Sequence, residues 1–166
     1  MKSLENVAAD INNYVDYIVI LQLIGLETNV PYNYSPLEHF KEALWLYSEL
    51  YERYGEEPET PENTHYVASI EYHLRMGILD VLLDIIETIK SRIRQFLQLP
   101  GNFVKKAEIR NLHHEYKALE ISIRMGPRLY NIEHIEDQIG NLKMLYSKSQ
   151  ELCNRIGGAR FIIKGS

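Results

Sequence analysis

The six histidines are the first residues to examine for chemistry, because imidazole binds metals and transfers protons near neutral pH. They are His39, His65, His73, His113, His114 and His134. A di-iron site in a helical bundle needs Glu-x-x-His pairs from facing helices, and this chain has a single such pair, Glu62 and His65. His113 and His114 are adjacent, so on a helix they point about 100° apart and cannot both bind one metal. We therefore expect no metal site and no cofactor.

Acidic residues lie together within the most apolar part of the chain. Asp80, Asp84 and Glu87 have the spacing of one helix face. Such a row can bind a cation or receive basic side chains from a partner helix. It is also what the narrow solvent face of a mostly buried helix looks like, and this is the interpretation we favour.

Basic residues follow directly, and they form the one candidate patch for an anion or an acidic partner. The patch consists of Lys90, Arg92, Arg94, Lys105 and Lys106. Positive charge also suits the carboxyl-terminal end of a helix, where it opposes the helix dipole. We expect a solvated end of a helical bundle here.

A further candidate is the segment 110–116, with the sequence RNLHHEY. It resembles the signature of HEPN-family helical ribonucleases, in which an Arg, often followed by Asn, precedes a His and frequently a Tyr. The resemblance implies metal-independent RNA cleavage across a dimer cleft, with the Arg110 guanidinium on phosphate and the His114 imidazole transferring protons. The family places four to six residues between Arg and His, whereas three separate Arg110 from His114. Arg128 and His134 have five residues between them but lack the polar residue after Arg.

Helices are expected to position all of these residues, because apolar side chains recur at three- and four-residue steps along the chain. The predicted helices cover about 3–25, 35–55, 60–99, 102–125 and 131–156. Short connections between the last three predict antiparallel neighbours. The expected fold is all-α, an antiparallel bundle of four long helices and one shorter one. Gly77 is the place in the long third helix where it can kink or another backbone can approach closely.

The second predicted helix has the clearest beginning. Ser35 can cap it, Pro36 suits its first position, and Gly55 ends it. Its apolar stripe, expected to face the core, consists of Leu37, Phe40, Leu44, Tyr47, Tyr51 and Tyr54. The centre of the core is expected at 78–86, which is apolar nearly all round.

Composition limits the function classes. The chain has 166 residues, 45% hydrophobic and 25% charged, which predicts a single bundle domain over 1–158 followed by a tail, 159–166. A net charge of −5 disfavours sequence-independent nucleic-acid binding. The single cysteine, Cys153, is expected in the core. The tail carries an apolar patch, 161–163, which either docks on a partner or folds back on the bundle.

No targeting or membrane-spanning segment is expected, since the longest apolar run, 17–26, is about half the twenty residues that a span requires. We therefore expect a cytoplasmic protein. Twelve tyrosines favour protein interfaces, because tyrosine combines an apolar body with a polar tip. The sequence thus predicts a non-catalytic helical subunit that binds protein, either itself as a homodimer or a larger complex. The alternative is a HEPN-like ribonuclease or its inactive relative.

Overall fold

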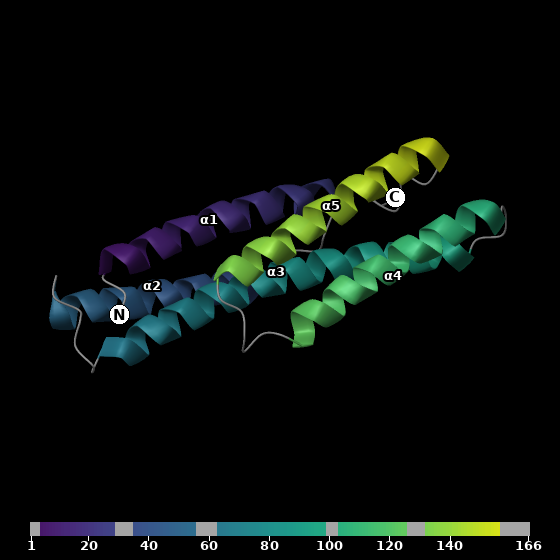
Figure 1. Ribbon diagram of the computed structural model, residues 1–166. Coiled ribbons are helices and arrows are strands. Elements are labelled where there is room, and N and C mark those ends of the chain that lie inside the picture. Colours follow the sequence, from purple (N-terminus) through teal and green to yellow (C-terminus); the bar gives the residue numbers. More distant parts are fainter. Residues whose placement is uncertain (1–3, 29–34, 56–62, 99–102, 126–131, 157–166) are drawn as a thin grey trace. The chain divides into compact units, whose positions relative to one another are not determined.

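The computed structural model describes residues 4–28, 35–55, 63–98, 103–125 and 132–156. These residues form α1 (Leu4–Glu27), α2 (Ser35–Tyr54), α3 (Thr64–Gln98), α4 (Phe103–Met125) and α5 (Ile132–Ile156), drawn in Figure 1. The predicted all-α bundle of five helices is confirmed, and α2, with 20 residues, is the shortest of the helices in these ranges. The connector 56–62, the turn 126–131 and the tail 159–166 lie outside the described residues.

The ends of the helices follow from local chemistry. At the end of α1, the buried Thr28 hydroxyl donates to the Ile24 carbonyl oxygen at 2.8 Å, so a side chain satisfies a carbonyl at the end of the helix. Gly55 has a φ of 59°, the left-handed conformation that glycine adopts without strain, and its N–H donates to the Tyr51 carbonyl oxygen at 2.9 Å. The predicted stop at Gly55 is therefore confirmed.

The chain divides into two compact units. The first contains residues 1–20 and 33–81, and the second contains 21–32 and 82–166. α1 and α3 therefore contribute residues to both units. The single domain over 1–158 stays a prediction.

In the first unit, α2 runs antiparallel to the beginning of α3. Ser35, at the start of α2, contacts Asp80, whereas Tyr54, at its end, packs edge-on against Tyr66 with ring centroids 6.4 Å apart. The two helices approach each other closely at Gly77, where an added Cβ would lie 3.3 Å from the Pro36 carbonyl oxygen. The close approach predicted at Gly77 is confirmed, because a side chain there would push α2 away.

In the second unit, α4 and α5 are antiparallel neighbours. Lys148 binds Glu115 at 2.5 Å and Arg155 binds Glu108, so residue numbers fall along α4 as they rise along α5. Between them, the buried hydroxyls of Tyr116 and Ser149 lie 2.9 Å apart. The Ser149 hydroxyl donates its one hydrogen to the Leu145 carbonyl oxygen, so it accepts the hydrogen of Tyr116.

Most of the apolar side chains between residues 78 and 86 of α3 are buried. Ile78, Leu79, Leu82, Ile85 and Ile86 are all at most 2% exposed, whereas Val81 and Leu83 of the same stretch are half-buried. That this stretch is the centre of the core stays a prediction. Cys153 is buried too, and burial raises the pKa of its thiol to about 11. It is a core residue, as predicted.

Candidate interaction surface

The apolar stripe predicted to bury α2 does not face the core. Leu37 is 50% exposed, Leu44 is 42% exposed and Tyr51 is 53% exposed. Their companions on the stripe are half-buried, namely Phe40, Tyr47 and Tyr54. We call these six side chains the α2 seam.

A different face of α2 is buried. Pro36, Ala43 and Leu50 follow one another at seven-residue steps and are the buried residues of this helix. Pro36 lies against Gly77, so small side chains on both helices let the two backbones come together. The expectation that the large apolar stripe faces the core was therefore wrong, because close backbone packing takes precedence at this contact.

The α2 seam has the spacing of a coiled-coil contact. Leu37, Leu44 and Tyr51 repeat every seven residues, and the half-buried members of the seam fall three residues after each. These are the a and d positions of a heptad, which insert between the side chains of a facing helix. The fold thus leaves exposed a surface whose pattern is typical of helix-to-helix packing.

A second apolar stripe is exposed along α1. It consists of Val15, Val19, Leu23 and Leu26, which are between 39% and 74% exposed. Their steps of four, four and three residues place them on one face of the helix. We call this face the α1 stripe. The opposite side of α1 is buried through Val7, Ile11, Tyr14, Leu21 and Ile24.

The length and composition of α1 also satisfy the requirement for crossing a membrane over Glu5–Glu27. A core helix of a soluble protein satisfies the same requirement. α1 carries four acidic residues and no Lys or Arg, whereas helices that lie on membrane surfaces are rich in basic residues. The charge pattern of α1 therefore differs from that of helices that lie on anionic membrane surfaces.

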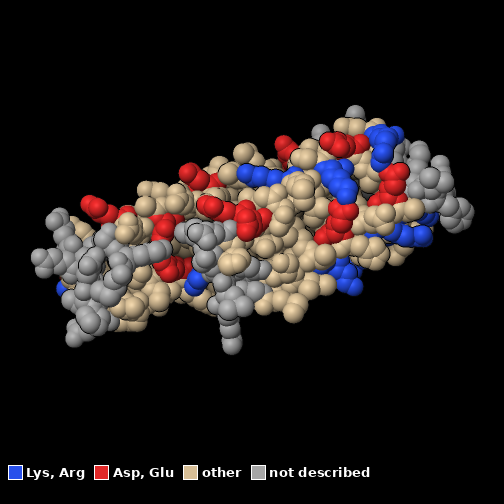
Figure 2. All heavy atoms as spheres, viewed as in Figure 1, with Lys and Arg blue, Asp and Glu red and all other residues tan. Residues whose placement is uncertain are grey.

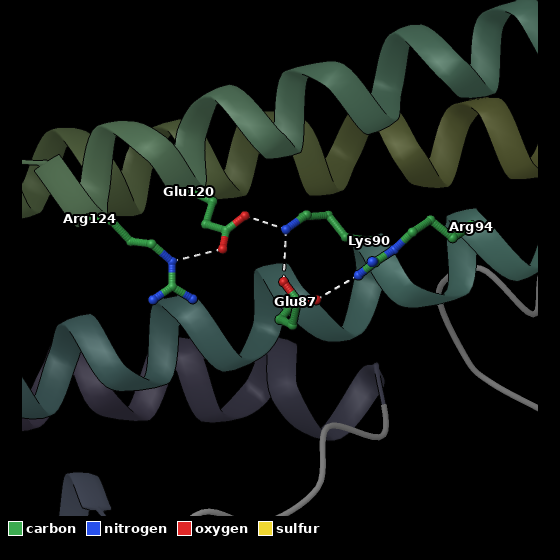
Figure 3. A network of polar contacts seen from close by, with 5 residues as sticks. All are labelled: Glu87, Lys90, Arg94, Glu120 and Arg124. Carbon is green, nitrogen blue, oxygen red and sulfur yellow. Dashed lines mark hydrogen bonds and ion pairs between the residues drawn. The ribbon is translucent and has the colours of Figure 1, made fainter.

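Two residues of the predicted basic patch, Lys90 and Arg94, are engaged in ion pairs. Lys90, whose side chain is 9% exposed, donates to Glu87 at 2.8 Å and also to Glu120 on α4 (Figure 3). Arg94 binds the other oxygen of Glu87 at 2.6 Å, and Arg124 binds Glu120 at 2.8 Å. Lys90 is therefore part of a network that joins α3 to α4 and is not available to an external anion.

The remaining patch residues have separate surroundings. Arg92 is half-buried, and burial lowers the pKa of its guanidinium. Lys106 is half-buried as well, and the side chain of Lys105 lies outside the described part of the chain. Of the acidic trio, Asp80 contacts Ser35, Asp84 is half-buried, and Glu87 belongs to the network around Lys90.

The residues of the ribonuclease-like segments lie on the surface. Arg110 and His114 are exposed one turn apart on α4, and His134 is exposed near the beginning of α5. Arg128 lies outside the described ranges. The neighbouring His113 is half-buried, and burial together with the charge of Arg94 lowers the pKa of its imidazole. The catalytic role of these residues stays a prediction.

A polar cluster between α2 and α3 was not predicted from the sequence. His39 Nδ1 lies 3.1 Å from His73 Nδ1, and His39 Nε2 lies 3.7 Å from an Asp80 carboxylate oxygen. The same Asp80 oxygen accepts the Ser35 hydroxyl at 2.5 Å. Four polar side chains therefore connect the beginning of α2 to α3 beside Gly77. The four-residue step from Ser35 to His39 and the seven-residue step from His73 to Asp80 place each pair on one face of its helix.

The histidine pair predicts a loss of stability in mild acid. A hydrogen bond between two Nδ1 atoms needs one of them unprotonated, and burial followed by the charge of His39 lowers the pKa of His73 from 6.5. Since His73 takes up its proton more readily in the unfolded chain, the free energy of unfolding should fall as the pH drops below about 6.5. We expect a change on the order of 1 kcal/mol, the net contribution of one hydrogen bond. Urea unfolding at pH 7.5 and 5.5 measures it.

His73→Gln should reduce this pH dependence, whereas His65→Gln, at an exposed position of the same helix, should leave it unchanged. The negative charge of Glu42 opposes the shift by favouring protonated His73. A His73→Gln chain with the full wild-type pH dependence would contradict this assignment.

Charge on the described surface is mixed. In Figure 2, basic side chains have acidic ones close by, and uncharged areas separate these groups.

Among the residues that the structure describes, no group of three or more His, Cys, Asp or Glu side chains is placed to hold a metal ion. The α2 seam and the α1 stripe are the exposed apolar faces of the described helices α2 and α1. No protein-family model, curated protein or solved structure matches this chain.

Proposed function

We propose that this protein is a non-catalytic helical subunit that works by binding protein. The observation that carries the proposal is the exposure of the apolar faces of α1 and α2, including Leu23 at 58% and Leu37 at 50%. Contiguous apolar surface outside a core is typical of interaction sites. The tyrosines of the α2 seam support the same function, because tyrosine is enriched at protein interfaces.

The test compares partner retention by matched surface variants. A tagged full-length chain is purified from its native cells as wild type, Leu23→Lys, Leu44→Lys and Met144→Lys. Met144 is 62% exposed on α5, outside both apolar faces, so its variant controls for added charge. We expect bound protein, either a second copy or another chain, to fall at least about tenfold in one of the first two variants and to persist in Met144→Lys.

Two results would contradict the proposal. One is a wild-type chain that stays monomeric and retains no protein. The other is metal-independent cleavage of single-stranded RNA that disappears in Arg110→Ala or His134→Ala. That result would favour the HEPN-like alternative.

A further inference from the structure

We propose that the occupant of the α2 seam is a second copy of this chain, whose α2 lies antiparallel to the first. This inference rests on the proposed function and identifies its partner. The six side chains of the α2 seam extend over most of α2, and all of them lie within one compact unit of the chain.

Antiparallel pairing makes the seam complementary to itself. When the two-fold axis passes between Trp45 and Leu46, each a position faces a d position of the other helix. Leu37 then faces Tyr54 of the second copy, Phe40 faces Tyr51, and Leu44 faces Tyr47. Every facing pair contains one tyrosine and one non-tyrosine side chain, so two tyrosines never compete for one space.

A parallel pair is less favourable for two reasons. It would place Tyr47 against Tyr47 and Tyr51 against Tyr51. It would also place each leucine against the same leucine of the other copy, and these smaller pairs would leave gaps between the helices. It would also align the two helix dipoles, which antiparallel pairing opposes. A partner of different sequence is not required to explain the pattern, because one α2 supplies both halves of it.

The exposed area indicates how tight this dimer is. A large apolar or aromatic side chain has roughly 150–250 Å² of surface, so the exposed parts of the seam add up to roughly 400–500 Å² per copy. This is below the approximately 800 Å² per partner of a standard stable interface. We therefore expect a dissociation constant in the micromolar range, so that the fraction of dimer rises with protein concentration.

The first experiment measures association of the full chain by sedimentation equilibrium between about 1 and 200 μM. The wild type and Met144→Lys should show a monomer–dimer equilibrium, and Leu44→Lys should weaken it at least about tenfold. Leu44 is 42% exposed, so lysine there leaves the fold intact, which circular dichroism verifies. A wild type that stays monomeric throughout would overturn the proposal.

If all three chains dimerise equally, the seam is not the interface. The proposed function then survives through the α1 stripe, and Leu23→Lys should dissociate the dimer instead. If the wild type is monomeric but another protein is lost from Leu44→Lys during purification, the proposed function stands and the second copy is wrong. The two proposals therefore fail separately.

The second experiment determines direction by distances between spin labels on single introduced cysteines. The buried Cys153 thiol, with its pKa raised to about 11, stays protonated and leaves labelling to the introduced position. At 1.5 Å per residue, labels on Glu38→Cys should lie about 22 Å apart along the helix axis, and labels on Trp45→Cys about 2 Å apart. A longer distance at 38 than at 45 supports the antiparallel dimer, and equal distances at both positions would overturn it.

Discussion

Replacing Ile89 with alanine is expected to lower the free energy of unfolding by about 2–5 kcal/mol. Ile89 is fully buried in α3, among the other large aliphatic side chains of its unit. Alanine removes the transfer free energy of three carbon atoms and leaves a space that the rigid helices fill only in part. Urea unfolding followed by circular dichroism measures the change in midpoint and slope.

Ile121→Ala is the matched control, because Ile121 lies on α4 and is 45% exposed. The same atoms are deleted, but no closed cavity forms, so we expect a loss below about 1 kcal/mol. Equal losses at positions 89 and 121 would show that the burial assigned to Ile89 is wrong.

The second large effect is expected at Glu120, the α4 carboxylate that binds Lys90. Glu120→Ala should lower the free energy of unfolding by about 2–4 kcal/mol, because it leaves a nearly buried ammonium with Glu87 as its remaining acidic partner within the described network. The expected loss of stability is smaller than for a buried charge without a partner, because Glu87 remains bound to Lys90. Thermal or urea unfolding of the full chain measures it.

Two controls separate this effect from loss of charge in general. Glu108→Ala breaks an exposed pair with Arg155 and should change stability by less than about 1 kcal/mol. The double variant Lys90→Met with Glu120→Leu removes both buried charges, and it should be close to wild type in stability. A double variant as unstable as Glu120→Ala would contradict the electrostatic explanation.

The same network determines a pH dependence. Hydrogen bonding to Lys90 lowers the pKa of Glu87 and of Glu120 below 4.5. Their stabilising contribution is therefore present above about pH 4.5 and is lost as the pH falls through the lowered values. Burial alone would lower the pKa of Lys90, but its bonds to Glu120 and Glu87 outweigh burial and raise it. That contribution is present below pH 10.5 and is lost above the raised value.

The helices were predictable because their signals are local. Ser35 and Pro36 begin α2, Gly55 ends it, and the close approach at Gly77 follows from the missing side chain. These signals act within one helical turn, so a single sequence contains them.

The orientation of α2 was not predictable in this way. Its strongest apolar stripe, beginning at Leu37, is the natural choice for the core, yet Pro36, Ala43 and Leu50 are buried instead. Periodicity shows that a helix has a face that avoids water, but it does not show whether that face meets the same chain or another one. The ion pair of Lys90 with Glu120 was not predictable for a related reason. Glu120 is thirty residues away along the chain, and no local pattern pairs the two residues.

The buried phenols of Tyr14 and Tyr116 set an alkaline limit on the folded chain. Burial raises the pKa of both hydroxyls well above the usual value of 10.0. In strong base these two hydroxyls ionise more readily in the unfolded chain than in the folded chain. Their ionisation is therefore coupled to unfolding, and it lowers the stability of the folded protein.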